Sequence, residues 1–247
     1  MREEKNPAIL CRDVRKAFGP VMAVQGLNLQ VFPGELYALL GVNGAGKTTT
    51  IKLLTGLLRP DGGTLEILGK KLPQEMEAMR RITAVSPQET AVAGLLTVRE
   101  NLELMARVHG FGKKEGRKRA SDTINALGLQ PVKDRRAKTL SGGWQRRLSI
   151  AMALIGEPQV LYLDEPTLGL DVLARRELWR EVESLKGKTT IVLTTHYMEE
   201  AQALSDRVGI MAGGRLLAEG TVEELCEKTG GENLEEAFVR LVEEEPS

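Results

Sequence analysis

The sequence predicts an α/β fold in which a parallel sheet forms the core, with an N-terminal antiparallel β-subdomain and an inserted helical subdomain. The first observation is a series of apolar runs of the kind found in parallel strands buried on both faces. These runs are LYALL at 36–40, VLYLD at 160–164, TTIVLTT at 189–195 and VGIM at 208–211. The second observation is a strand-rich first third, and the third is a helical pattern from about residue 90 to 155.

The strand-rich first third predicts the β-subdomain. AILCRDV at 8–14 and LNLQVF at 27–32 are two strand patterns, and the turn at Pro33–Gly34 closes the second. TLEILG at 64–69 predicts one more strand. A chain of 247 residues with 42% hydrophobic content can bury the core of one α/β unit, so a second independent domain is not required.

The helical pattern contains its own start and stop signals. Thr97 and Glu100 form a capping box ahead of a helix that Gly110 ends, and Gly128 ends a second helix. We therefore assign residues 89–155 to the helical subdomain, and residues 1–88 and 156–220 to the α/β core with its β-subdomain.

The C-terminal part predicts a hairpin followed by two short helices. Gly213–Gly214 is a hairpin turn. Thr221 and Glu224 form a second capping box, and a last helix begins near Leu234. Residues 221–247 are assigned to a helical tail.

Composition limits the partners and the compartment. Lysine plus arginine and aspartate plus glutamate are 34 each, so there is no broad field for nucleic acid, and none is expected as a partner. Cys11 and Cys226 lack metal-ligand spacing and are expected to be core residues in a reducing compartment. The N-terminus MREEKNPA has no apolar segment of a secretory signal, and residues 17–34 contain too many polar residues and prolines for a membrane span. We expect a cytoplasmic protein.

A phosphate-binding loop follows the strand at 36–40. Its glycines let successive backbone N–H groups point at phosphate oxygens, and the helix that starts there adds its positive dipole end. Lys47 supplies a charge for the β- and γ-phosphates, and the Thr48 hydroxyl is a suitable Mg²⁺ ligand. The alternative is a glycine-rich turn with an exposed lysine. The loop residues are Gly41, Val42, Asn43, Gly44, Ala45, Gly46, Lys47, Thr48 and Thr49.

Two carboxylates emerge at the end of the strand at 160–164, where open α/β sheets bind ligands. Asp164 fits the role of holding Mg²⁺, and Glu165 can polarise the water that attacks a γ-phosphate. The alternative is a strand-end carboxylate that caps the next turn. Beside a phosphate loop, the chemistry predicts a nucleoside triphosphatase.

Ser141, Gly142 and Gly143 precede a second helix whose N-terminus is suited to binding an anion. Read alone, it is equally an ordinary N-cap. A chain with one complete phosphate loop has no obvious use for a second one, unless the second completes a site on another subunit. This suggests an active site composed from two chains.

Together these motifs resemble those of the nucleotide-binding subunit of an ATP-binding cassette (ABC) transporter, over the whole chain. Walker A at 41–49, Gln88 in SPQE, the signature LSGG at 140–143, Walker B ending at Asp164, then Glu165 and His196 occur in the family order. The resemblance implies a P-loop NTPase (RecA-like) fold, with ATP as substrate and Mg²⁺ held by Thr48, Gln88 and Asp164.

The resemblance also implies roles for individual residues. Glu165, His196 and Gln88 would be the catalytic group, with His196 hydrogen-bonded to the γ-phosphate. Ser141 to Gly143 of a second chain would close over the ATP. Phe18 stands where the family stacks an aromatic ring on adenine, although it could also be an ordinary core residue. Which of Glu165 and His196 is the principal catalyst stays open.

By the same resemblance, the partners are a second nucleotide-binding subunit, most simply an identical copy, and a separate integral membrane subunit. The protein would then lie at the cytoplasmic face of the membrane. Trp144 replaces the glutamine that commonly follows LSGG, and this departure, with LTVRENL and NLEEAFVRLV, resembles drug and antibiotic exporters. The alternatives are an importer subunit, a soluble ABC ATPase acting on ribosomes or DNA, and a non-hydrolysing nucleotide sensor.

Overall fold

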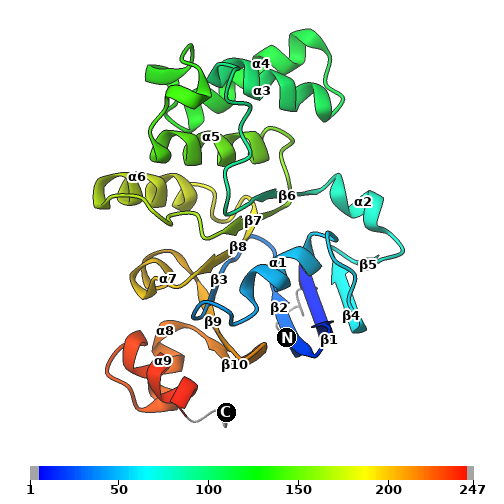
Figure 1. The fold of residues 1–247 in the computed structure, drawn as a ribbon, viewed down its shortest axis with the longest axis vertical. Helices are drawn as coiled ribbons and strands as arrows, with labels where there is room; N and C mark the ends of the chain where they lie inside the picture. Colours follow the sequence, from blue (N-terminus) through cyan, green and yellow to red (C-terminus); the bar gives the residue numbers. More distant parts are fainter. Residues whose placement is uncertain (1–5, 244–247) are drawn as a thin grey trace, which may run out of the picture.

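The computed structural model describes residues 6–243 and contains two sheets with helices around them (Figure 1). The first residues of the charged N-terminus, 1–5, and the end of the predicted tail, 244–247, lie outside the described residues. In Figure 1, α3 and α4 lie at one end of the molecule, and α8 and α9 lie at the opposite end.

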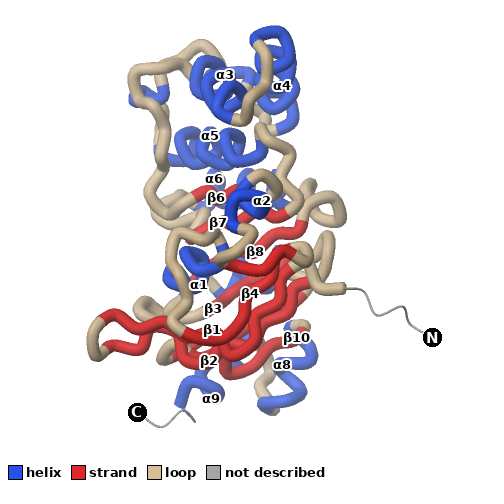
Figure 2. The backbone as a smooth tube through the Cα atoms, turned by 90° about the vertical axis from the view of Figure 1, so that its right-hand side faces the viewer, coloured by secondary structure: helices blue, strands red, loops and turns tan. Residues whose placement is uncertain are grey.

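The N-terminal sheet is antiparallel and has the strand order β2-β1-β4-β5. It forms from the first third of the chain, as the sequence predicts. Its strands are β1 (Ile9–Phe18), β2 (Val21–Val31), β4 (Gly62–Ile67) and β5 (Lys70–Leu72). Figure 2 shows β1, β2 and β4 beside the strands of the second sheet.

The second sheet has the order β10-β9-β3-β8-β7-β6, and its strands are parallel except for β10 at the edge. All residues of β3, β7 and β8 are buried, which explains why these strands are continuous apolar runs. The predicted hairpin at Gly213–Gly214 is confirmed by the antiparallel pairing of β9 with β10. The strands are β3 (Leu36–Leu40), β6 (Thr83–Ser86), β7 (Val160–Asp164), β8 (Thr190–Thr195), β9 (Arg207–Ala212) and β10 (Arg215–Gly220).

Helices cover the parallel sheet and form the end that lies beyond β6 in Figure 1. Both predicted capping boxes are confirmed, with Thr97 beginning α3 and Thr221 beginning α8. The α-helices are α1 (Lys47–Leu54), α2 (Met76–Arg80), α3 (Val98–Val108), α4 (Lys113–Ala126), α5 (Gly142–Leu154), α6 (Val172–Glu183), α7 (Met198–Leu204), α8 (Val222–Thr229) and α9 (Leu234–Glu243). Two short 3₁₀ turns, η1 (Gln130–Val132) and η2 (Ala137–Thr139), lie between α4 and α5.

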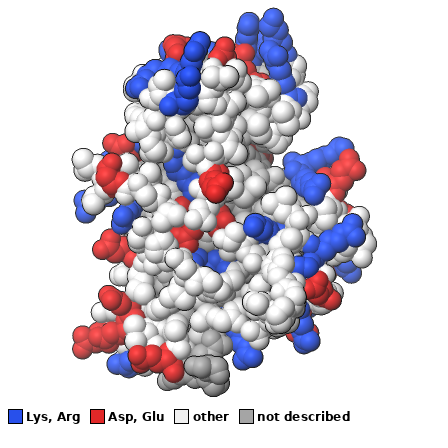
Figure 3. Space-filling model, viewed as in Figure 1, with Lys and Arg blue, Asp and Glu red and all other residues white. Residues whose placement is uncertain are grey.

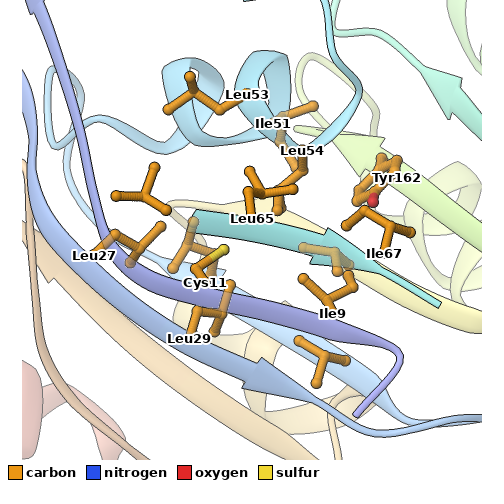
Figure 4. Close-up of a cluster of buried hydrophobic side chains, with 14 of the residues drawn as sticks. Ile9, Cys11, Leu27, Leu29, Ile51, Leu53, Leu54, Leu65, Ile67 and Tyr162 are labelled. Carbon is orange, nitrogen blue, oxygen red and sulfur yellow. The ribbon is translucent and has the colours of Figure 1, made fainter. Parts of the chain in front are cut away.

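The largest apolar cluster joins the two sheets through α1 (Figure 4). Strands β1, β2 and β4 contribute Ile9, Cys11, Leu27, Leu29, Leu65 and Ile67, helix α1 contributes Ile51, Leu53 and Leu54, and β7 contributes Tyr162. A separate cluster holds α3, α4 and α5 together, and it includes Leu148, Ala151 and Ile155 of α5. Cys11 is buried as expected, whereas Cys226 is only half-buried, because it lies away from the inner face of α8 that Leu225 occupies.

The surface carries both signs of charge. In Figure 3, lysine and arginine side chains gather over the α3 and α4 end, and aspartate and glutamate side chains gather over the α8 and α9 end. No helix within residues 6–243 is both long and apolar enough to span a membrane.

Candidate active site

Lys47, Glu165 and His196 follow three neighbouring parallel strands, β3, β7 and β8, and line the same cleft. Strand β8 lies between β3 and β7, and the carboxyl ends of all three strands meet at one edge of the sheet. A cleft of about 450 Å³ opens there. Its lining residues are Val21, Met22, Ala23, Asn43, Gly44, Ala45, Gly46, Lys47, Thr48, Thr49, Gln88, Glu165, Leu168 and His196.

The loop between β3 and α1 needs glycine for its path. Gly46 has a φ of 101°, and a Cβ atom there would lie 2.4 Å from the carbonyl oxygen of Ala23. Any other side chain would therefore force the loop away from β2. Because Gly46 immediately precedes α1, the free backbone N–H groups of the first helical turn lie at the cleft.

Lys47 is held inside this loop. Its Nζ atom donates to the carbonyl oxygens of Gly41 at 2.7 Å and Val42 at 3.2 Å, and it lies 3.2 Å from Oε1 of Glu165. Only 6% of the Lys47 side chain is exposed. The alternative of a glycine-rich turn with an exposed lysine is therefore wrong.

Asp164 lies at the end of β7 and faces two hydroxyl groups. Thr194 Oγ1 donates to Asp164 Oδ1 at 2.6 Å, and Thr48 Oγ1 lies 3.3 Å from the same oxygen. Thr194 belongs to β8 and is the register partner of Asp164. This pairing fixes a carboxylate next to the hydroxyl that begins α1.

Glu165 is buried and has an unusual backbone conformation. Its φ is 47°, in the left-handed region that side chains other than glycine rarely adopt. Its N–H donates to the carbonyl oxygen of Thr194 at 3.1 Å and to Thr194 Oγ1 at 3.0 Å. The carboxylate then points into the cleft, where Oε2 lies 2.7 Å from Nδ1 of His196.

Some predicted residues do not line the cleft. The Gly41 N–H donates to Thr195 in the sheet at 3.3 Å, and the side chain of Val42 is exposed. Phe18, at the end of β1, is 49% exposed, so its alternative assignment as a core residue is wrong. It is separated from Val21, which does line the cleft, by a two-residue turn and pairs with it across the hairpin.

Ser141, Gly142 and Gly143 are also absent from the lining of the cleft. They lie at the start of α5, where Ser141 is the N-cap by backbone conformation but its side chain makes no capping hydrogen bond. Ser141 and Gly142 are exposed to solvent. The hydroxyl of Ser141 and the first N–H groups of α5 can therefore donate hydrogen bonds to a ligand from outside the chain.

Comparisons with known proteins identify the family. The model of the ABC transporter family matches residues 24–168. Daunorubicin resistance ATP-binding protein DrrA3 of Streptomyces coeruleorubidus is 42% identical over 92% of this chain and 72% of its own length. Nod factor export ATP-binding protein I of Burkholderia orbicola is 43% identical over 89% of this chain and 73% of its own length. The chain belongs to the ABC transporter family.

Solved structures agree with this assignment. An ATP-binding subunit of an ABC transporter superposes with a TM-score of 0.84 at 31% identity, covering 95% of this chain and 99% of that one. The dimeric structure of MJ0796, a bacterial ABC transporter cassette, superposes with a TM-score of 0.78 at 26% identity, covering 86% and 98%. This protein is therefore an ABC transporter ATPase with the cassette fold.

Trp144 lies in the first turn of α5, next to the exposed helix start, and is itself half-buried. The Trp144 ring packs on the α3–α5 cluster, and the guanidinium of Arg147 lies 4.5 Å from the ring centroid. Arg147 in turn forms ion pairs with Glu177 at 2.9 Å and Glu181 at 3.0 Å, both on α6. Trp144 thus packs on the helical cluster, and Arg147 connects it to α6.

Sequence reasoning missed two residues that hold the ABC site together, Thr194 and Arg146. Thr194 sits in an apolar run, and only its register with Asp164 reveals its contact. The position of Arg146 could have been predicted from the sequence, because it lies four positions before the buried Ile150 and so on the inward face of α5. A charged residue in that position predicts a buried guanidinium with dedicated partners.

Proposed function

We propose that this protein hydrolyses ATP in a site that two copies complete together, and that it uses the cycle to drive export through a separate membrane subunit. One observation carries the proposal: Lys47, Glu165 and His196 converge on one cleft, while Ser141 to Gly143 lie outside it. The cleft contains the phosphate-binding and hydrolytic groups, and the exposed start of α5 is suited to a nucleotide held by the other copy.

In this proposal each residue has a defined role. The N–H groups of residues 43–49 and the Lys47 ammonium bind the β- and γ-phosphates. The Glu165 carboxylate accepts a proton from the attacking water, and His196 orients both that carboxylate and the γ-phosphate. Gln88 lines the cleft, and we assign it contacts to the attacking water and the metal. We assign Phe18, the hairpin partner of Val21, as the adenine-stacking residue.

The donor set at Thr48 and Asp164 fits Mg²⁺. The hydroxyl and carboxylate oxygens lie 3.3 Å apart, and both are hard oxygen ligands. Mg²⁺ commonly keeps several waters and takes its remaining ligands from substrate phosphates, and when bound here it would neutralise the charge that develops on them.

Export, rather than import, is supported by the relatives. The Streptomyces protein is named for daunorubicin resistance and the Burkholderia protein for Nod factor export. In both names the ATP-binding protein is a component of its own, which supports a separate membrane subunit here. The protein then works at the cytoplasmic face of the membrane, and an identical second copy is the simplest partner because all motifs occur in this chain.

The variant Glu165→Gln tests hydrolysis and dimerisation together. It keeps the size of the side chain but cannot accept the proton, so it should bind ATP, dimerise and barely hydrolyse. Light scattering at saturating ATP with Mg²⁺ should give the dimer mass, and a monomer would contradict the two-copy site. The control is Glu199→Gln, which changes an exposed glutamate of α7 and should hydrolyse at the rate of the unmodified protein.

Purification of Glu165→Gln with ATP from solubilised native membranes tests the partner. A membrane protein in near-equal amount is the expected result. Recovery of ribosomal or chromosomal proteins instead would favour the soluble alternative and contradict the transporter assignment of this chain.

A further inference from the structure

The Arg146 guanidinium lies at the centre of a set of main-chain hydrogen bonds. Only 4% of the residue is exposed. Its Nη2 donates to the carbonyl oxygens of Asp164 at 2.7 Å and Glu165 at 2.6 Å, and its Nε donates to Pro166 at 2.7 Å. Its Nη1 donates to Gln88 at 3.2 Å and also to Pro87. One side chain therefore binds five carbonyl groups, two in the segment after β6 and three at the end of β7 and in the segment that follows it.

These contacts are unusual for a buried cation. Within residues 6–243, Arg146 forms no ion pair, and its acceptors are all backbone carbonyls. Burial lowers the pKa of the guanidinium to about 10, while the charges of Asp164, Glu200 and Glu165 oppose that shift. The group stays charged at neutral pH. A guanidinium has five N–H donors in a rigid plane, which is why arginine can hold several carbonyls in one arrangement.

The two loops that Arg146 joins both carry proposed catalytic residues. Strands β6 and β7 are parallel neighbours, so the segment after β6 with Gln88 and the segment after β7 with Glu165 leave the sheet side by side. Helix α5 is fixed to β6 by a second contact, a buried hydrogen bond of 2.9 Å between Ser86 and Ser149. Arg146 lies one turn of α5 away from that contact and reaches both segments.

The hydrogen bond from Arg146 to the Glu165 carbonyl oxygen stabilises an unusual backbone conformation of Glu165. A left-handed conformation is unfavourable at a residue other than glycine, and it persists only where the surroundings enforce it. Thr194 binds the N–H of Glu165, and Arg146 binds its carbonyl oxygen. Both sides of the strained residue are thus held, and the direction of its carboxylate is fixed.

We propose that Arg146 is a positioning residue that couples the signature helix to hydrolysis. Helix α5 begins at Gly142, directly after its N-cap Ser141. Arg146 lies in the first turns of the helix, so the helix and the backbone of Glu165 and Gln88 move as one unit. Engagement of the helix start by ATP bound to the other copy then sets the position of the catalytic carboxylate. This inference rests on the proposed function, in particular on the role of Glu165.

The first test compares Arg146→Lys and Arg146→Met with the matched pair Arg147→Lys and Arg147→Met. Arg147 is the next residue of the same helix and is also buried, but its partners are Glu177 and Glu181 on α6. Arg146→Met should lower kcat by about 100-fold, the effect of displacing a catalytic group by about 1 Å. Arg146→Lys, which keeps the charge and some of the donors, should be intermediate.

The ATP concentration for half-maximal rate should change by less than about threefold in both Arg146 variants, because Lys47 and its loop are untouched. The Arg147 variants should change thermal stability and leave kcat within about threefold. If Arg146→Met does not fold, Arg146→Lys carries the test. Unchanged kcat in Arg146→Lys, or an equal loss of kcat in Arg147→Lys, would overturn the proposal.

A double-mutant cycle in single-turnover hydrolysis separates positioning from stability. If Arg146 acts through Glu165, adding Arg146→Lys to Glu165→Gln should slow the remaining hydrolysis by less than about twofold. Multiplication of the two single effects would overturn the positioning role. Hydrolysis by Glu165→Gln at the unmodified rate is a different result, because it contradicts the proposed function itself.

Discussion

The Nδ1 atom of His196 lies 2.7 Å from Oε2 of Glu165, although 31 positions separate the two residues. The contact follows from strand register. Asp164 and Thr194 are partners in the parallel pair β7 and β8, and Glu165 and His196 leave the sheet just beyond them. The sheet therefore holds together the carboxylate and the histidine that we propose as catalytic.

Replacing His196 should slow hydrolysis without preventing ATP binding. In His196→Ala the carboxylate of Glu165 loses its orienting partner, so kcat should fall by about 100-fold while ATP binding changes little. Steady-state phosphate release and titration with a fluorescent ATP analogue measure the two quantities. His109→Ala, at the exposed end of α3, is the control. A normal kcat in His196→Ala would refute the role of the contact.

Lys47→Ala should abolish ATP binding and hydrolysis, since it removes the ammonium group that the phosphate loop holds at the cleft. The control is Lys52→Ala, which removes an exposed charge from the same helix and should bind ATP normally. Equilibrium titration reads out both. Our assignment of the loop is wrong if Lys47→Ala keeps its ATPase rate.

Asp164→Asn should raise the Mg²⁺ concentration needed for half-maximal hydrolysis. The amide keeps the shape of the side chain and can still accept from Thr194, but it is a neutral and weaker ligand for a hard cation. Titration of the ATPase rate with Mg²⁺ at fixed ATP measures the change, and chelation should stop hydrolysis in both forms. An unchanged Mg²⁺ requirement would remove Asp164 from the metal site.

Stability should depend on pH through Glu181. Burial raises the pKa of this carboxyl group from 4.5 to about 7, against the opposing effect of Arg147. Because the folded state holds the proton more tightly than the unfolded state, this contribution is complete below pH 4.5 and is lost as the pH rises to about 7.

Glu181→Gln removes this titration. The free energy of unfolding of the unmodified protein, relative to Glu181→Gln, should fall between pH 5 and 7 and then stay level, as measured by urea denaturation. A constant difference across that range would show that Glu181 titrates normally. Glu183→Gln, at the exposed end of the same helix, is a suitable control.

Much of the fold follows from local patterns in the sequence. The apolar runs correspond to β3, β7, β8 and β9 because a parallel strand buried on both faces has no polar side. Thr97 and Thr221 predict helix starts because the capping interaction spans only three residues. The glycine-rich loop before α1 and the carboxylates at the end of β7 are also local patterns, so the sequence predicts them as well.

The sequence could not predict contacts that depend on strand register or on packing between elements that are distant in the chain. The bond from Thr194 to Asp164 depends on strand pairing, and the contacts of Arg146 depend on how α5 crosses β6 and β7. Val21, Met22 and Ala23 line the cleft only because β2 passes beside the loop at Gly46. The exposure of Phe18, rather than its burial in the core, likewise depends on how β1 pairs with β2.

The two-copy site is tested most directly by mixing two inactive chains. Lys47→Ala disables the cleft, and Ser141→Arg blocks the exposed start of α5, so neither chain should hydrolyse ATP alone. Mixed in equal amounts, half of the dimers combine one intact cleft with one intact signature motif, and activity should return to about one quarter of the normal rate. A mixture as inactive as its components, or full activity of Ser141→Arg alone, would contradict an active site shared between two copies.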